Sequence, residues 1–356
     1  MINYASKYEK ELAQEFALKS VVDGAVGKDY EFTGVKNIKV YTAVSQPLND
    51  YQRSGQNRYG VPTEVQDTVQ DMEVKKDRSF SLTIDKGNNS EQMDAKAPGK
   101  ILKIEMDEQV IPEMDKHALT TFIDVAGLTA TAATAPTEQT IVKAISDAMV
   151  AMGNAKVPNQ NRTIFLTWEA YGMLRLSNQF IGVEGLAKDI LTHGTLGMFM
   201  NARVVPVPDE YLTKGNKKAH FVVVYKNAVL QPKKIQDYFV KENPAGINGA
   251  LLEGRFIYDA FVIAAKAKGV YALCEANARQ ATPTIAYSNG NATVTSSGAS
   301  KIRVTTDGTD PRFSDTAVET TTGGAVPAAS GATVKAVAFS STLFASEVKT
   351  QVVTAS

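Results

Sequence analysis

The chain has 356 residues, of which 44% are hydrophobic, so it is long enough to bury the cores of two or three domains without disulfide or metal support. Lys plus Arg and Asp plus Glu both total 38, and this balance disfavours a protein that binds nucleic acid or an anionic membrane through its overall charge. The single cysteine, Cys274, excludes an intrachain disulfide framework and leaves too few thiolates for a structural zinc site.

The N-terminal segment carries charged residues throughout, where a secretion signal would need an unbroken apolar run. No stretch approaches the roughly 20 apolar residues that cross a bilayer. We therefore expect folding in a reducing cytoplasm, with no export signal and no membrane span.

The first predicted element is an amphipathic helix over residues 4–18. Tyr4, Tyr8, Leu12 and Phe16 recur at steps of four and form one apolar stripe. Because such a stripe requires a partner surface, the segment predicts an N-terminal arm.

Two half-buried strands come next, since the hydrophobic period changes to two. The alternating residues are Ile38, Val40, Thr42 and Val44 in one strand and Phe80, Leu82 and Ile84 in the other. The stretch between them, QPLNDYQRSGQNRYGVPTEVQDTVQD, has too few large apolar residues to form a core. It predicts a long excursion from the body.

Two helices with broad apolar faces follow. Pro112 fits the first turn of one, which Gly127 closes, and Thr137 is the predicted N-cap of the other. We expect the linker between them, LTATAATAPT, to be loose. The two faces comprise Met114, Ala118, Leu119, Phe122, Ile123 and Ala126, and then Ile141, Val142, Ile145, Ala148, Met149 and Met152.

The middle of the chain alternates strand and helix patterns and predicts a mixed α+β body. The predicted strands are RTIFLT, ARVVPVP and HFVVVYKNAVL, the predicted helix is WEAYGMLRLS, and GRFIYDAFVIAAKAKGVYAL closes the body. The segment CEANARQATP predicts a linker, with a domain boundary near Thr282.

Residues 282–356 predict a separate all-β unit, in which one residue in three is Ser or Thr. TIAYSNGNATVT predicts a hairpin with a left-handed turn at Asn289-Gly290. Further strands are predicted at Lys301–Thr306, TVKAVAF and SEVKTQVV, and together they indicate a small immunoglobulin-like sandwich.

No catalytic, cofactor-binding or metal site is expected. His117, His193 and His220 are far apart and lack metal-ligand spacing, and we expect His117 to be solvated on the polar side of its helix. Cys274 is expected to be a small buried hydrophobe. The chain contains no P-loop, no G-x-G-x-x-G and no G-x-S-x-G.

Three carboxylates of the C-terminal unit, Asp307, Asp310 and Asp315, are of the type that binds calcium, but their spacing is not that of an EF-hand. The better interpretation is structural, with a turn at Asp307-Gly308 and a bend at Asp310-Pro311. A glycan site would need exposed aromatic rings, and most of the four in this unit are expected in its core. These are Tyr287, Phe313, Phe339 and Phe344.

The order of these elements resembles that of the major capsid protein of tailed bacteriophages. EQVIPEMDKHAL resembles the start of the family's spine helix, NRTIFLTWEAYGMLRLS its strand followed by a helix, and EGRFIYDAFVIAAKAKGVYAL its closing strands. The likeness covers about residues 1–275, and LTATAATAPT departs from it where the family's spine helix often runs on. It implies an α+β phage-capsid-type fold over residues 1–281, with an N-terminal arm (1–30), an extended loop region (31–100), and spine-helix peripheral and axial domains (101–281).

The stretches KIRVTTDGTDPRFS and TVKAVAFSSTLFASEV resemble the C-terminal immunoglobulin-like module of chitobiase and hexosaminidase enzymes. The catalytic domain of those enzymes has no counterpart here, so no hydrolase activity is implied. The resemblance implies an immunoglobulin-like surface domain over residues 282–356.

Together the resemblances imply a structural, non-enzymatic subunit that assembles with itself, as hexamers and pentamers, into an icosahedral shell around phage double-stranded DNA. The expected place is the virion capsid, assembled in the host cytoplasm. Scaffolding and portal proteins are implied partners, DNA is a non-specific neighbour, a glycan at the immunoglobulin-like domain is a further possible partner, and no cofactor is implied.

The residues expected at subunit interfaces are aromatic and Arg types in the two predicted arms. They are Tyr4 and Tyr8 in the N-terminal arm and Tyr51, Arg53, Arg58 and Tyr59 in the excursion. The alternative is that the excursion residues only decorate a loop.

Two other functions remain open on the sequence. An encapsulin-type compartment would share the fold and enclose an enzyme cargo. A carbohydrate-binding surface protein would form no shells, and its 282–356 fragment would bind chitin or cell-wall glycan.

Overall fold

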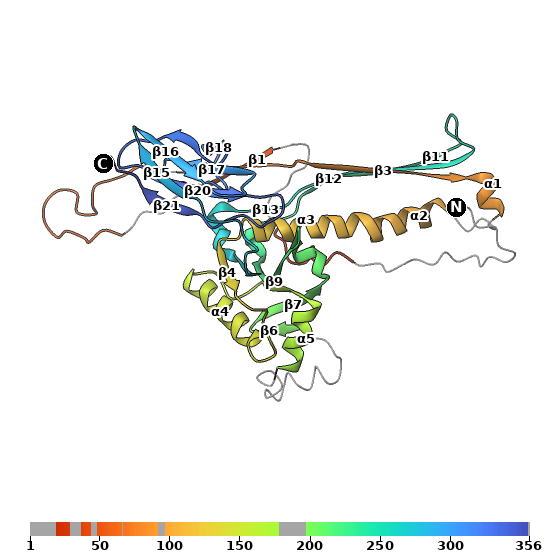
Figure 1. Ribbon diagram of the computed structural model, residues 1–356, viewed down its shortest axis with the longest axis horizontal. Helices are drawn as coiled ribbons and strands as arrows, with labels where there is room; N and C mark the ends of the chain where they lie inside the picture. The colour runs from red at the N-terminus through yellow and green to blue at the C-terminus, as the bar shows by residue number, and fades with distance from the viewer. Residues whose placement is uncertain are drawn as a thin grey trace.

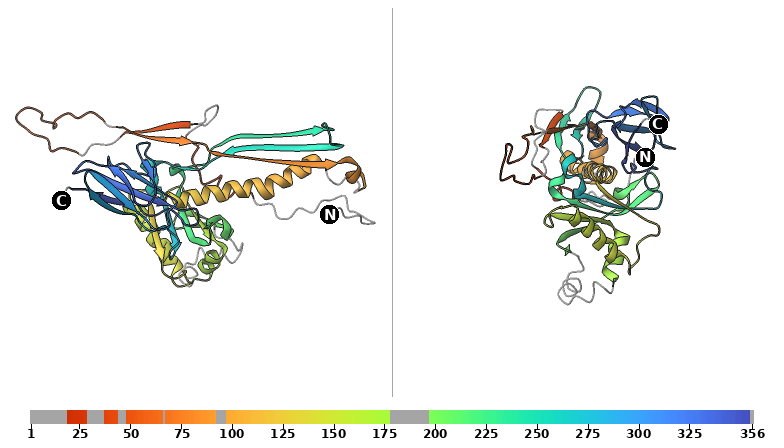
Figure 2. Two further views of the ribbon diagram at one scale, coloured as in Figure 1. Left: turned by 45° about the horizontal axis from the view of Figure 1, so that its top comes forward. Right: turned by 90° about the vertical axis from the view of Figure 1, so that its left-hand side faces the viewer.

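The computed structural model describes residues 19–28, 37–43, 48–65, 67–91, 97–177 and 197–354. A central body carries a three-stranded arm on one side and a two-stranded ribbon on the other, with a β unit at the C-terminal end beside the body (Figures 1 and 2). The predicted mixed α+β class is confirmed.

The body is built on one seven-stranded mixed sheet, in the order β4-β14-β9-β5-β7-β6 with β8 paired to β9. Neighbours β4/β14 and β5/β7 are parallel, and β9 is antiparallel to both of its main partners. The strands are β4 (Leu128–Ala132), β5 (Arg162–Thr167), β6 (Met198–Phe199), β7 (Ala202–Val207), β8 (Thr213–Lys214), β9 (Lys217–Tyr225) and β14 (Val270–Glu275).

Both faces of this sheet are buried, which explains its continuous β-branched runs. Val222 and Val224 of β9 point into a core shared with helix α3 (Ile111–Asp124). Phe221 and Val223 point into the opposite core, shared with α4 (Ile141–Asn154) and α5 (Trp168–Leu176). The predicted helix face is confirmed, since Ile141, Ile145, Ala148 and Met152 are all buried.

One long helix crosses the top of the body and continues under the arm (Figure 1). It comprises α2 (Pro98–Glu105), a π-helical turn (Met106–Val110) and α3, and at 1.5 Å per residue it is about 40 Å long. Pro112 lies in the first turn of α3 as predicted, but the long helix does not begin there, because α2 and the π-helical turn run directly into α3. Proline has no N–H to donate, and the wider preceding turn, in which the Ile111 N–H reaches the Met106 carbonyl, lets the helix pass through it.

The linker predicted to be loose contains strand β4, which pairs in parallel with β14. The predicted N-cap at Thr137 is also wrong, because helix α4 begins at Ile141 after a turn. In that turn the Thr137 carbonyl accepts the Ile141 N–H at 2.9 Å, and the Thr140 hydroxyl accepts the Thr137 N–H at 2.8 Å.

The arm is an antiparallel sheet in the order β11-β12-β3, made of β3 (Lys76–Asp85), β11 (Lys233–Glu242) and β12 (Gly249–Tyr258). Its inner face packs on the long helix: Leu252 lies with Leu102, and Phe256 lies with Met114. Helix α1 (Lys86–Glu91) follows β3 at the far end of the arm (Figure 1).

The ribbon pairs β1 (Asn37–Ala43) with β2 (Asp67–Glu73). The first strand was predicted, although Val44 lies outside the described residues, whereas β2 occupies the end of the predicted excursion. Val40 and Met72 bury the ribbon's root against the body. The short pair β10 (Val229–Leu230) and β13 (Phe261–Val262) lies beside this root.

The C-terminal unit has two antiparallel sheets whose inner faces share one core. The hairpin turn is confirmed, since Asn289 and Gly290 have φ of 50° and 76°. One sheet comprises β15 (Thr284–Ser288), β16 (Asn291–Thr295) and β19 (Gly324–Pro327), and the other comprises β18 (Val318–Thr320), β17 (Lys301–Thr305), β20 (Thr333–Phe339) and β21 (Lys349–Val352).

Short 3-10 turns connect the strands at Asp209–Leu212, Lys226–Ala228 and Ala264–Gly269. None of the helices in the described ranges is long and apolar enough to span a membrane. Cys274 is buried as predicted, and that burial raises the pKa of its thiol.

Candidate assembly surfaces

The loop at the outer end of the ribbon, residues 48–65, has a defined shape although nearly all of it is exposed. The rings of Tyr51 and Tyr59 meet edge to face at 5.1 Å between centroids. The Gln52 N–H donates to the Arg58 carbonyl at 2.9 Å, and the Arg58 Nε donates to the Gly55 carbonyl at 3.3 Å. Tyr59 is nevertheless 84% exposed, so an apolar surface faces solvent on an ordered loop.

The structure brings four of the six predicted interface residues together in this loop: Tyr51, Arg53, Arg58 and Tyr59. Tyr4 and Tyr8 lie outside the described residues. Arg53 and Arg58 are the only charged residues between positions 51 and 60, so the end of the ribbon is aromatic and basic.

A second exposed apolar surface lies on β11 of the arm. Tyr238, Phe239 and Val240 are 58%, 57% and 43% exposed. Successive side chains on a strand point to opposite faces, so apolar groups here are accessible on both faces of the sheet. These apolar side chains are not covered within a single subunit, whereas contact with a neighbouring molecule would cover them.

A third group of exposed apolar side chains lies on the body, near the ends of α5 and at β6. Trp168, Leu176 and Met198 are more than half exposed. The Trp168 ring rests edge to face on Tyr171 at 5.7 Å. This places the chain's one tryptophan on the surface, at the first residue of α5.

Two buried carboxylates of the body, Asp259 and Asp115, are used in structural contacts. His117 Nε2 and Asp259 Oδ1 are 2.8 Å apart, and the same carboxylate accepts the Lys75 and Ala260 N–H groups at 2.9 Å each. Burial raises the pKa of Asp259, but these hydrogen bonds outweigh it and leave the pKa below its ordinary value. The prediction that His117 is solvated is wrong, because Asp259 follows β12 and reaches the helix only in the folded chain.

Asp115 is also buried, and it binds the segment that precedes the ribbon. Its carboxylate accepts the Ser20 hydroxyl at 2.9 Å and the Val21 N–H at 2.7 Å. Burial raises the pKa of Asp115, and the hydrogen bonds oppose that rise. The chain before β1 is thereby attached to the long helix.

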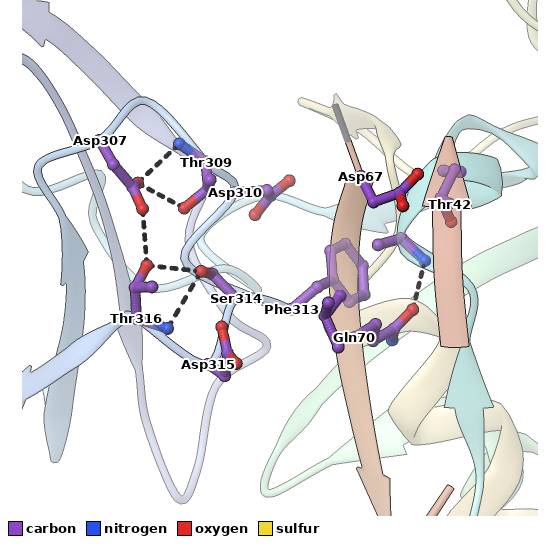
Figure 3. Close-up of a pocket in the computed structure, with 13 residues that line it drawn as sticks. Thr42, Asp67, Gln70, Asp307, Thr309, Asp310, Phe313, Ser314, Asp315 and Thr316 are labelled. Atoms are coloured by element: carbon purple, nitrogen blue, oxygen red, sulfur yellow. Dashed lines mark hydrogen bonds between the residues drawn. The ribbon is translucent and has the colours of Figure 1, made fainter. Parts of the chain in front are cut away.

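The aspartates of the TDGTDP stretch are engaged by their own loop, and Figure 3 shows this for Asp307. Asp307 accepts hydrogen bonds from the Thr309 N–H and hydroxyl and from the Thr316 hydroxyl, at 2.6 to 2.9 Å. Asp310 binds the guanidinium of Arg312, with the closest pair at 2.7 Å. The structural interpretation of both turns is confirmed, and Gly308 has the left-handed φ of 78° that such a turn requires.

This loop and the root of the ribbon form the two walls of a cleft of about 450 Å³ (Figure 3). Phe313 projects from the loop toward Gln70 of β2. Thr42, Asp67 and Asp315 line the outer part. Within the described ranges, no three His, Cys, Asp or Glu side chains are arranged to hold a metal ion.

The C-terminal unit is packed tightly against the body. Phe344 is fully buried in the core on the α3 side of the main sheet, and Phe313 packs against the same core. Most of the four aromatic residues of this unit were expected in the unit's own core. The segment predicted as a linker is held as well, since Arg279 forms a bridge with Phe344 and donates to the Ala345 carbonyl at 3.0 Å.

No protein family and no curated protein matches the sequence. Solved phage structures do match the fold. A structure from Mycobacterium phage Che8 aligns with a TM-score of 0.64 at 18% identity, over 77% of this chain and 98% of its own. The capsid of cyanophage P-SCSP1u gives 0.63 at 12% identity, and the mature capsid of bacteriophage PhiM1 gives 0.58 at 12%, each over 77% of this chain and 93% of its own.

The chain has the fold of phage capsid proteins. The likeness that the sequence suggested is therefore confirmed for the fold, at identities that leave little sequence in common. Within this capsid fold, residues Tyr51 to Tyr59 lie at the end of the ribbon, and the exposed β11 residues lie on the arm. Sequence reasoning missed Tyr238 and Phe239, although three consecutive apolar residues between charged ones, QDYFVKE, were a usable signal.

Proposed function

We propose that the chain is a major capsid subunit that assembles with itself into an icosahedral shell enclosing phage double-stranded DNA. The proposal rests on the capsid fold together with the exposed aromatic residues on the two extensions of the body. A capsid subunit acts by binding copies of itself and needs no catalytic centre.

The ribbon loop and the arm supply the contacts in this proposal. Covering one large side chain such as Tyr59 or Phe239 contributes about 1.5 to 3 kcal/mol. Each contact is weak on its own, but a subunit held by several neighbours gains effective concentration for every further contact. Contacts of this heterologous kind close into rings, which in this proposal are hexamers and pentamers.

The charge balance is consistent with a shell that encloses DNA without binding it tightly. Lys plus Arg equal Asp plus Glu, so packaged DNA would lie near the shell by confinement and not by counterion release. Scaffolding and portal proteins are the other partners in this proposal. Assembly would take place in the host cytoplasm, and the finished location is the virion.

The domain division belongs to the same proposal: a capsid domain over residues 1–281 and an immunoglobulin-like surface domain over residues 282–356. The matched share of 77% is about 274 of the 356 residues, close to the length that precedes the C-terminal unit. Two antiparallel sheets around one core support the immunoglobulin-like assignment. Decoration of the outer surface or weak glycan attachment is the role proposed for this domain.

Negative-stain microscopy of the purified chain, expressed alone and together with its scaffolding protein, tests the proposal. Uniform hollow particles are expected. A chain that stays monomeric at high concentration under both conditions contradicts it, and enclosed enzyme in place of DNA would favour the compartment alternative.

A further inference from the structure

The C-terminal end of helix α3 is capped by side chains from far along the chain. Arg312 Nη1 donates to the carbonyls of Ala126 and Val125 at 2.6 and 3.4 Å, and Arg279 Nη2 donates to that of Ile123 at 3.0 Å. The last carbonyls of a helix have no partner within it, and a cation there is favourable for the helix dipole. The C-terminal unit and the segment before it therefore supply side-chain donors to the carbonyls at the end of this helix.

The loop that carries Arg312 is held rigid before it meets the body. Asp310 fixes the guanidinium at 2.7 Å and the Arg312 N–H at 3.0 Å. From strand β17, Arg303 donates to the carbonyls of Arg312 and Ser314 at 3.1 and 2.8 Å. A rigid loop loses little conformational entropy on docking, so its contacts can fix the positions of the elements that it touches.

The same loop touches the ribbon. Ser314 forms an antiparallel bridge with Gln70 of β2, and Phe313 lies between the loop and that strand (Figure 3). Gln70 is itself fixed to the body, since its amide donates to the Val262 carbonyl at 2.9 Å and accepts the Ala264 N–H at 2.7 Å. Outward from this point the ribbon borders the open cleft, and its loop from 48 to 59 is exposed.

We propose that the C-terminal unit is an internal brace: its 307–316 loop joins the end of the long helix to the root of the β1–β2 ribbon and so sets the direction in which the ribbon leaves the body. This function is separate from surface decoration or glycan attachment. The brace itself does not depend on the proposed capsid function. Only the use of the ribbon's direction, which is contact with neighbouring subunits, rests on that proposal.

The size of the effect follows from the ribbon's length. Three residue pairs at about 3.3 Å each carry the strands about 10 Å beyond Gln70, and the 48–65 loop continues outward from there, so a rotation of about 20° at Gln70 moves the strand ends by about 3.5 Å and the loop by more. Side-chain contacts require heavy atoms within about 4.5 Å, so such a movement would break contacts made by Tyr51 and Tyr59 on a neighbouring subunit.

The test compares hydrogen exchange in the full-length unassembled subunit and two variants. The double variant Arg312→Ala with Phe313→Ala removes the helix cap and the ring against the ribbon. The control, Lys301→Ala, removes a basic side chain that pairs with Glu319 at 3.0 Å inside the same unit. In the double variant we expect at least tenfold faster exchange in both β2 and the last turn of α3, unchanged exchange in β17 and β20, and a several-fold lower particle yield. The control should match the parent.

Unchanged exchange in β2 while β17 and β20 stay protected would overturn the brace. If the double variant unfolds the C-terminal unit, Arg312→Lys replaces it, because lysine keeps the charge but lacks the planar guanidinium that binds Asp310 through Nε and Nη2 while Nη1 reaches the helix carbonyls. In that variant, exchange at the parent's rate in both β2 and the end of α3 would also overturn the brace. If the parent itself forms no particles, the capsid proposal fails, and the exchange measurements still decide on the brace.

Discussion

Asp259 joins three parts of the chain at one carboxylate. It accepts hydrogen bonds from His117 on the long helix, from the Lys75 N–H just before the arm, and from its own neighbour Ala260. Asp259 and Ala260 are buried and His117 is half-buried, while Lys75 contributes only its backbone N–H; the loop tyrosines, by contrast, expose their rings. The side chains that hold the subunit together and those proposed to join subunits are therefore separate sets, and each can be changed without the other.

Asp259→Asn tests the first set through the pH dependence of unfolding. The pKa of Asp259 lies below its ordinary 3.8, so its contribution is present above that value and is lost as the pH falls through the folded-state pKa. We expect the variant to lose about 1 to 3 kcal/mol of unfolding free energy at pH 7 and to show a flatter decline below about pH 4. Urea unfolding of the unassembled subunit over a pH series measures this, with exposed Asp50→Asn as the control. Identical pH profiles would contradict the role of Asp259.

Replacing both Tyr51 and Tyr59 with alanine tests the second set. Because both rings are exposed, the unfolding free energy of the subunit should change by about 1 kcal/mol or less. Particle yield should fall tenfold or more, since every copy loses two buried rings at its contact. Yield is measured by sedimentation, with Gln56→Ala in the same loop as the matched control. Full yield from the double variant would remove this loop from the interface.

At the scale of elements, local sequence pattern predicted well wherever an element's own residues decide its structure. The β-branched run at Arg162–Thr167, the α4 face and the Asn289-Gly290 turn are of this kind, and so is the first part of the predicted run HFVVVYKNAVL, which breaks after Tyr225 at a 3-10 turn. Elements fixed by distant partners were missed. Strand β4 is made of small residues and pairs with β14, which lies far along the chain, so nothing nearby in the sequence marks it as a strand.

The same limit applies to the candidate surfaces. The composition of the 51–59 stretch was enough to select its tyrosines and arginines. The run Tyr238 to Val240 is an ordinary strand pattern until the structure places both of its faces in solvent. His117 was misjudged for a similar reason, since its partner Asp259 is close only after folding.

The junction between α3 and β4 gives a prediction at this scale. A Cβ on Gly127 would lie 2.3 Å from the carbonyl carbon of Ala267, so the two backbones pack too closely for any side chain. Gly127→Ala should cost about 1 to 3 kcal/mol of unfolding free energy. Gly153→Ala in α4 is the matched control, because no atom lies within 4 Å of its new Cβ, and it should stabilise by about 0.5 to 1 kcal/mol. Equal effects from the two substitutions, measured by urea unfolding, would refute the close packing.

At the scale of the whole molecule, the C-terminal unit and the body share a buried core. Phe344 fills part of the core beneath α3, and Asp124 at the end of that helix accepts the Ala345 N–H at 2.9 Å while it pairs with Lys214 at 2.6 Å. The sequence suggested a separate unit behind a linker, because composition changes sharply near Thr282. Composition does not record which aromatic residues cross to the neighbouring core.

The whole subunit thus presents two extensions with exposed aromatic residues on one braced body. Hydroxyl-radical footprinting of Tyr51, Tyr59, Tyr238 and Phe239, compared between unassembled subunits and purified particles, tests most directly whether these surfaces are made to be covered by other copies. We expect all four rings to react readily in the subunit and to become several-fold less reactive in the particle. Equal reactivity in both states, or a subunit that never forms particles, would contradict this expectation.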